Sequence, residues 1–180
     1  MATFFQQSLF VLLLLHAHQV VSSTPDHHGL IRTLNFSLFQ QQVPNKTAFI
    51  VLTGVTGVGV SLTTAPFGTI YLANDRLTAE SNASSETLGT VQVAFLTSSM
   101  DGLQTMLFAN FILKTKDREG SISVFGGVKN TEPSPVQVLG GTGDFMHVQG
   151  YATCLPVVQV DAGVVFPYEF FLSWPPIRKR

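Results

Sequence analysis

Beyond its first two dozen residues, the chain consists of short runs of Phe, Val, Leu, Ile and Thr that Gly and Pro interrupt at close intervals. Such runs are typical of β-strands. No window of helical length shows convincing 3.6-residue periodicity, and strand-like runs do not alternate with helical ones, which disfavours a parallel doubly wound sheet. We therefore expect an all-β fold. The predicted strands are 34–40, 47–53, 67–73, 88–98, 104–114, 121–125, 136–139, 145–154 and 164–173.

The run 88–98 has two faces of weak polarity. One face carries Val91, Val93, Phe95 and Thr97, and the other carries the residues between them. This pattern suits a sheet with one face inside the molecule and the other covered by a neighbouring subunit. A closed antiparallel barrel follows, since closure removes exposed sheet edges. The dipeptide Asp101-Gly102, which follows this run, predicts a type I′ hairpin turn.

Composition narrows the range of partners. The chain has 180 residues, 45% of them hydrophobic and only 12% charged, with a net charge of −1. This composition excludes a disordered chain and gives no reason to expect a nucleic-acid partner, which requires a basic face. Its one cysteine excludes an intrachain disulfide and a multi-cysteine zinc site. The length predicts one domain.

The N-terminal segment predicts export. The apolar run 9–15 is followed by small residues at Val21 and Ser23, a pattern that indicates a secretory signal peptide over residues 1–23 and a single mature domain over residues 24–180. The run is too short to span a bilayer, and no later apolar segment is long enough, so we expect no membrane association. The alternative is a buried N-terminal helix.

Three glycosylation sequons agree with export. They begin at Asn35, Asn45 and Asn82. Asn45 follows a proline and Asn82 lies in a loop-like segment, so these two are the preferred sites. Asn35 adjoins an alternating apolar stretch and is the less favoured one.

Motifs for catalysis or cofactor binding are scarce. The glycine-rich segment 54–59 lacks the third glycine of a dinucleotide fingerprint and the lysine of a phosphate loop, and no nucleophile elbow is present. On the predicted strand 145–154, His147 and Cys154 have opposite parity, which disfavours a shared metal. We predict neither metal nor cofactor. The glycine-rich run 139–145 is interpreted as a tight turn with positive φ, with a ligand loop as the alternative.

Several motifs together resemble those of the plant dirigent family, in order and spacing, from about residue 34 to residue 172. The matching segments are Pro44–Ala48, Pro66–Ile70, Asn74–Thr78, Gly89–Gln92, Ser98–Gly102, Gly140–Phe145 and Gly150–Ala152. Two further segments, Asp101–Met106 and Ser121–Gly126, look most like the subgroup linked to localised, Casparian-strip-type lignin.

The resemblance implies an eight-stranded antiparallel β-barrel that is secreted to the apoplast, the cell-wall space, and is commonly a trimer, with a dimer as the alternative. It also implies a pocket for phenolic radicals, such as the coniferyl alcohol radical, which a separate laccase or peroxidase produces. The expected function is regio- and stereoselective coupling of these radicals in lignan or localised lignin biosynthesis, without redox catalysis by the chain itself. The alternative is a cell-wall binding or scaffold protein without coupling control.

The chain departs from the family where acid chemistry is expected. Phe39-Gln40-Gln41 stands in place of a His-Asp pair, and Gly126-Gly127-Val128 in place of an Asp. The pocket tyrosines of relatives fall at Phe95 and Thr97. Lyase-type cyclisation, which needs a proton donor, is therefore disfavoured. The candidate pocket residues are Gln41, Asp75, Phe95, Thr97 and Val128, although Asp75 has a structural alternative as a turn cap.

Overall fold

The computed structural model describes residues 31–55, 58–160 and 163–176. All regular structure in these residues is β-strand. The strands are β1 (Arg32–Gln42), β2 (Ala48–Leu52), β3 (Ile70–Thr78), β4 (Thr87–Thr97), β5 (Thr105–Lys114), β6 (Glu119–Val128), β7 (Ser134–Gly143), β8 (Gln149–Cys154), β9 (Val158–Val160) and β10 (Gly163–Trp174). Within the same ranges, no helix has the length and apolar character needed to cross a membrane. The predicted signal peptide lies outside the described residues.

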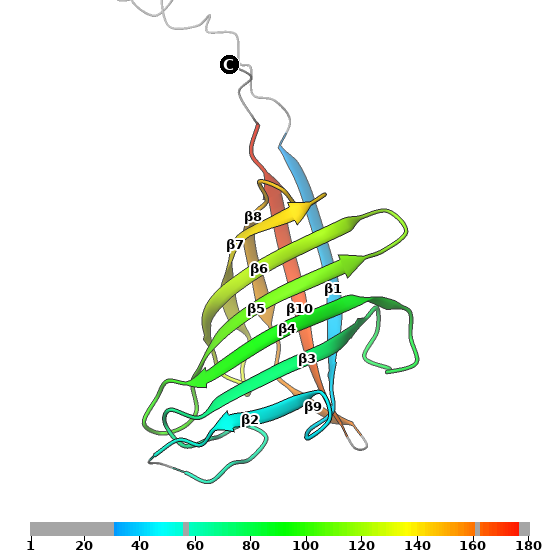
Figure 1. Cartoon of the computed structure of the whole chain (residues 1–180). Coiled ribbons are helices and arrows are strands. Elements are labelled where there is room, and N and C mark those ends of the chain that lie inside the picture. Colours follow the sequence, from blue (N-terminus) through cyan, green and yellow to red (C-terminus); the bar gives the residue numbers. More distant parts are fainter. Residues whose placement is uncertain (1–30, 56–57, 161–162, 177–180) are drawn as a thin grey trace, which may run out of the picture. The chain divides into compact units, whose positions relative to one another are not determined.

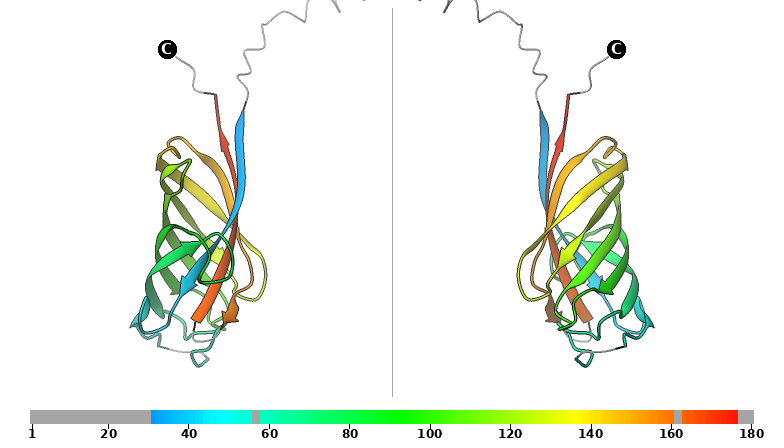
Figure 2. Two further views of the ribbon diagram at one scale, coloured as in Figure 1. Left: turned by 90° about the vertical axis from the view of Figure 1, so that its right-hand side faces the viewer. Right: turned by 90° about the vertical axis from the view of Figure 1, so that its left-hand side faces the viewer.

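The strands form a closed antiparallel barrel (Figure 1). The hydrogen-bonded order is β1-β10-β8-β7-β6-β5-β4-β3-β2, and an additional pairing of β1 with β3 closes the ring. Eight strands therefore make the barrel. The two short strands extend it, β2 along β3 and β9 along β10. Figure 2 shows the strands from both sides as they wrap around a common interior. The expected eight-stranded antiparallel barrel is confirmed.

Two sequence predictions about the second half of the chain need correction. The glycine-rich run 139–145 has the predicted positive φ at Gly143, 58°, but Gly140 to Gly143 belong to the end of β7 and the turn begins only at Asp144. That turn includes His147, whose φ of 62° is incompatible with the predicted strand 145–154. The strand there begins only at Gln149. The parity argument that separated His147 from Cys154 therefore does not apply.

The connection from β4 to β5 also differs from the prediction. It extends from Ser98 to Gln104, so it is longer than a two-residue hairpin. Only Gly102 has a positive φ, 74°, whereas a type I′ turn needs two such residues. The Asp101 carboxylate explains the longer loop, since it accepts hydrogen bonds from the Ser99 hydroxyl and the Leu103 backbone N–H.

Alternate residues of each barrel strand fill the interior. The β4 face predicted to lie inside is buried: Val91 and Thr97 are 0% exposed, Val93 is 4% exposed and Phe95 is 8% exposed. In the middle of the barrel, the Phe111 ring packs edge-on against Tyr168 and Phe170, at centroid distances of 5.0 and 5.1 Å.

The end of the barrel near the start of β1 is closed by aromatic packing. Phe145 is 1% exposed and stacks on Trp174, whose indole N–H donates to the Met146 carbonyl oxygen at 3.1 Å. The Arg32 guanidinium lies over the same indole, 4.0 Å from its centroid. The interior is thus filled at this end, which leaves the opposite end for a cavity.

Candidate ligand-binding cavity

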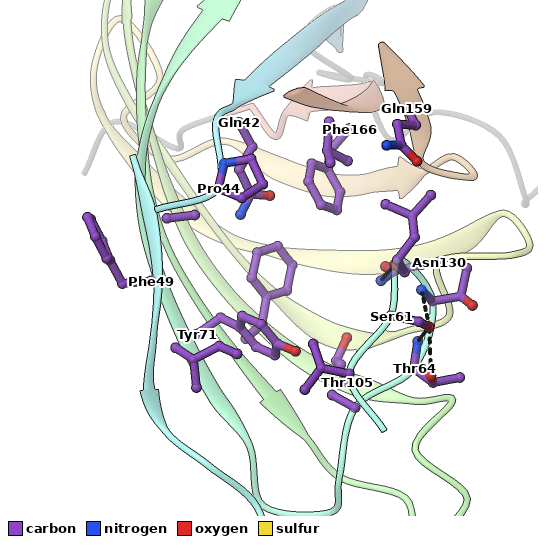
Figure 3. Close-up of a pocket in the computed structure, with 18 of the residues that line it drawn as sticks. Gln42, Pro44, Phe49, Ser61, Thr64, Tyr71, Thr105, Asn130, Gln159 and Phe166 are labelled. Carbon is purple, nitrogen blue, oxygen red and sulfur yellow. Dashed lines mark hydrogen bonds between the residues drawn. The ribbon is translucent and has the colours of Figure 1, made fainter. Parts of the chain in front are cut away.

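A cavity of about 430 Å³ lies at the barrel end where β2 and β9 are found (Figure 3). Its wall combines inward-facing residues of β1, β2, β3, β4, β5 and β10 with residues from the loops at that end. The volume falls within the range of about 300–1,000 Å³ that is usual for small-molecule sites. Barrel closure therefore creates one concave site from segments that are far apart in the sequence.

Three aromatic rings form the inner wall of the cavity. Tyr71 of β3 lies directly across from Phe95 of β4 in the strand register. Phe95 in turn stacks on Phe166 of β10, with 5.7 Å between ring centroids and an interplanar angle of 29°. These rings offer flat apolar surfaces on which a planar aromatic ligand can stack.

The polar part of the lining carries no charge. The side chains that contribute it are Gln42, Asn45, Ser61, Thr63, Thr64, Tyr71, Thr105, Asn130 and Gln159. Among the described residues that line the cavity, none is Asp, Glu, Lys, Arg or His. Amides and hydroxyls can hydrogen-bond to a neutral ligand, but they cannot neutralise a carboxylate or an ammonium group.

A segment of the β2–β3 connection, residues 60–65, forms one side of the cavity. Its conformation is held by a 2.7 Å hydrogen bond between the Ser61 and Thr64 hydroxyls. The Ala65 backbone N–H donates to the Gly102 carbonyl oxygen at 3.2 Å, which fixes the segment to the β4–β5 loop. Only glycine suits position 102, because its φ is positive and a Cβ would lie 2.5 Å from the Ala65 oxygen.

A buried chain of three polar side chains lies beyond the cavity. The Gln40 amide donates to Oδ2 of Asp75 at 2.6 Å, and the Tyr168 hydroxyl donates to Oε1 of Gln40 at 3.0 Å. All three residues are at most 1% exposed. Among the described residues, Oδ1 of Asp75 has no hydrogen-bond partner. Because burial penalises the charged form, the pKa of Asp75 is raised, although the polar side chains of Thr47 and Gln40 oppose the shift.

The Tyr168 hydroxyl and the neighbouring Cys154 thiol are held in their neutral forms. Burial raises the pKa of Tyr168 well above its ordinary value and raises the pKa of Cys154, its neighbour across β8 and β10, to about 12. Cys154 is therefore an unreactive thiol at neutral pH. Within the ranges the structure describes, no group of three His, Cys, Asp or Glu side chains could hold a metal ion.

The five residues predicted from the sequence occupy different environments. Phe95 lines the cavity. Asp75 belongs to the buried polar chain, and Thr97 and Val128 are buried in the wall without lining the cavity. Gln41 points to the face of β1 opposite to that of Gln40 and Gln42. Its amide donates to the Thr78 hydroxyl at 2.9 Å and to the Ser81 carbonyl oxygen at 3.1 Å. It anchors the β3–β4 connection instead of facing the cavity.

Sequence reasoning missed several cavity residues. Gln42 and Phe166 follow the inward parity of their own strands, so a period-2 pattern could have found them. Tyr71 lies within a predicted strand, but its facing was not assigned. The contribution of Asn130 and of residues 60–65 depends on how loops meet at the barrel end, and no local pattern indicates it.

The three sequons lie at exposed positions. Asn45 is in the turn between β1 and β2, with a φ of 61°, and it also lines the mouth of the cavity. Asn82 is in the β3–β4 connection, where its Oδ1 accepts hydrogen bonds from the backbone N–H and the hydroxyl of Ser84, both at 2.9 Å. Asn35 is exposed on β1. Accessibility agrees with glycosylation, which stays a prediction.

Comparisons with known proteins identify relatives. The sequence profile described as Dirigent-like protein matches residues 33–172, from β1 into β10. Dirigent protein 9 of Arabidopsis thaliana is 34% identical over 100 residues, which cover 52% of this chain and 31% of that protein. A dirigent protein of Sinopodophyllum hexandrum is 30% identical over 91 residues, which cover 48% of this chain and 46% of that protein. The matched part therefore spans less than half the length of these curated relatives.

A solved structure shares the fold. The pterocarpan synthase dirigent protein GePTS1 superposes with a TM-score of 0.69 at 20% sequence identity, over 86% of this chain and 99% of that one. At this identity the likeness establishes the barrel architecture alone.

Proposed function

Because the chain belongs to the dirigent family, we propose that its barrel cavity binds phenolic radicals and biases the geometry in which they couple. The observation that carries the proposal is the cavity of about 430 Å³, with aromatic rings on one wall and uncharged hydrogen-bonding groups around the rest. A neutral phenol matches this lining, since its ring can stack and its oxygens can be hydrogen-bonded.

Control of coupling requires orientation of the reactants. A phenoxyl radical that is held with one face against the wall reacts through the other face. A free-energy difference of about 1.4 kcal/mol between the two arrangements gives tenfold selectivity. In this proposal the radicals, such as that of coniferyl alcohol, come from a separate laccase or peroxidase, and the products belong to lignan or localised lignin biosynthesis.

The lining favours an auxiliary role over acid catalysis. The protein GePTS1 is named a synthase, and a cyclising reaction would need a proton donor in contact with the ligand. In the described lining, tyrosine, threonine, serine and the amides are the available donors, all of them weak acids. The buried carboxyl of Asp75 lies beyond the cavity wall. We therefore place the chain among non-catalytic coupling proteins.

The same proposal includes export and glycosylation. A signal peptide over residues 1–23 and glycans at the exposed Asn45 and Asn82 would put the barrel in the apoplast, where wall phenols are oxidised. A glycan on Asn45 would begin at the mouth of the cavity.

The outer face of the barrel supports a homo-oligomer, and the family resemblance makes a trimer the first choice. Outward side chains form an apolar row across five neighbouring strands. The row consists of Phe49, Leu72, Ala94, Phe108 and Phe125, each opposite the next in the strand register. Phe49, Leu72 and Phe108 are each about half exposed, at 50%, 47% and 49%. A continuous apolar surface of this kind is typical of a subunit interface.

The test is a coupling assay in which coniferyl alcohol is oxidised by a laccase with and without the protein. We expect one enantiomer of the coupled product to be in excess only when the protein is present. Racemic product together with measurable binding of the phenol would instead favour the scaffold function. Absence of both selectivity and binding would contradict any role for the cavity in phenol chemistry.

A further inference from the structure

We propose that Tyr71 and Thr105 together recognise the phenolic oxygen of the ligand, so that the cavity selects neutral phenols whose hydroxyl is attached directly to the stacked ring. The inference rests on the proposed function, and it assigns the polar contact that would set the orientation of the ring.

The hydroxyl of Tyr71 is available for a ligand. Its ring is half-buried in the cavity wall, across from Phe95 in the strand register, and Figure 3 labels Tyr71 among the residues that line the cavity. Among the described residues, no hydrogen bond to the Tyr71 hydroxyl is formed. Burial raises the pKa of Tyr71, so the hydroxyl keeps its proton and can donate it in a hydrogen bond.

The hydroxyl of Thr105, on the other neighbour of β4, is also available for a ligand. Thr105 lines the cavity from the first position of β5, and its Oγ1 is buried with no partner among the described residues. A buried hydroxyl without a partner is costly, and most such groups in folded proteins are satisfied. A ligand oxygen in the cavity would satisfy it.

The strand register explains why these two groups act on the ring oxygen. Tyr71 is opposite Phe95 on β4, and Thr105 is opposite Thr97, two residues further along the same strand. The two side chains therefore extend from β3 and β5, the strands on either side of β4, next to Phe95. A ligand ring stacked on Phe95 brings the oxygen attached to it within their reach, while a longer side chain extends toward the amides at the mouth. A carboxylated phenol would find no cation in the described lining.

Two probes and four variants test the inference. Coniferyl alcohol carries the phenolic oxygen, 3-methoxycinnamyl alcohol lacks it, and the affinity of each is measured by isothermal titration calorimetry. The cavity variants Tyr71→Phe and Thr105→Val remove one hydroxyl each. The matched controls Tyr151→Phe and Thr90→Val make the same chemical changes at exposed positions on the outside of the barrel.

A net hydrogen bond corresponds to about a threefold to tenfold change in affinity. We expect each cavity variant to weaken coniferyl alcohol binding by this factor and to leave 3-methoxycinnamyl alcohol unchanged, with both controls like the wild type. Equal weakening of both probes, or no weakening, would overturn the assignment. If the assignment fails but the wild type still gives an enantiomeric excess in the coupling assay, the proposed function stands without the assignment of Tyr71 and Thr105. If the wild type binds neither probe, the proposed function fails as well.

Discussion

Replacement of Phe95 by alanine separates a cavity wall from a sealed core. Phe95 is 8% exposed, stacks on Phe166 and borders the cavity. In a sealed core, truncation of phenylalanine costs about 3–5 kcal/mol, because a new void adds to the lost transfer free energy. Here the space released joins an existing cavity, so the transfer contribution dominates and we expect a loss of about 2 kcal/mol.

Phe111→Ala is the matched control for this substitution. Phe111 is 0% exposed, its ring contacts Tyr168 and Phe170 on β10, and it does not line the cavity. We expect Phe111→Ala to lower the free energy of unfolding by about 3–5 kcal/mol, as at a sealed core position. Phe111 makes no direct contact with the ligand.

Urea denaturation gives the two stability losses, and titration calorimetry with coniferyl alcohol gives the affinities. Phe95→Ala should weaken binding by at least the factor expected from a lost aromatic contact, about threefold or more. The account would be refuted if Phe95→Ala were as destabilising as Phe111→Ala and left the affinity unchanged. Phe95→Tyr provides a second check, since an open cavity accepts the added hydroxyl and a sealed core would lose about 1–3 kcal/mol.

Further predictions concern pH, processing and assembly. Because burial raises the pKa of Asp75 above 3.8, the folded state holds this proton more tightly than the unfolded state. The free energy of unfolding should therefore fall as pH rises from 3.8 toward the raised pKa. Urea titrations of Asp75→Asn should not show this fall. An equal pH dependence in the wild type and the variant would contradict the prediction. The proposed export predicts a mature chain that begins at Thr24 and loses mass on glycosidase treatment, through Asn45 and Asn82, whereas an intact, unglycosylated chain would argue against export. Light scattering at micromolar concentration should give an oligomer that Phe108→Glu disrupts, and a monomeric wild type would disprove the interface.

The sequence predicts the fold well because strand alternation is a local property. On β4 the period-2 pattern correctly places Val91, Val93 and Phe95 in the interior, since the strand alternates regularly from Thr90 to Thr97. Turns were harder to predict. The hydrogen bonds of the Asp101 carboxylate and the positive φ of His147 arise from contacts of single residues, which a pattern of residue types does not determine.

The candidate site could be predicted only in part. The sequence predicts Gln41 in the cavity, but Gln42 faces it, since an error of one residue along a strand turns a side chain to the opposite face. Part of the remaining lining comes from the β2–β3 connection, the β6–β7 loop and β9, which barrel closure brings together. Such long-range proximity has no signature in a single sequence. Phe95 was found because its position rests on strand parity alone.

The central claim is that a neutral phenol binds inside the barrel, and intermolecular nuclear Overhauser effects test it most directly. Coniferyl alcohol is titrated into protein with isotope-labelled aromatic side chains, and contacts from the ligand ring to the protein rings are recorded. We predict contacts to Tyr71, Phe95 and Phe166 inside the cavity, and none to Phe108 on the outer face of β5. Contacts to Phe108 without any to the three cavity rings would contradict the account.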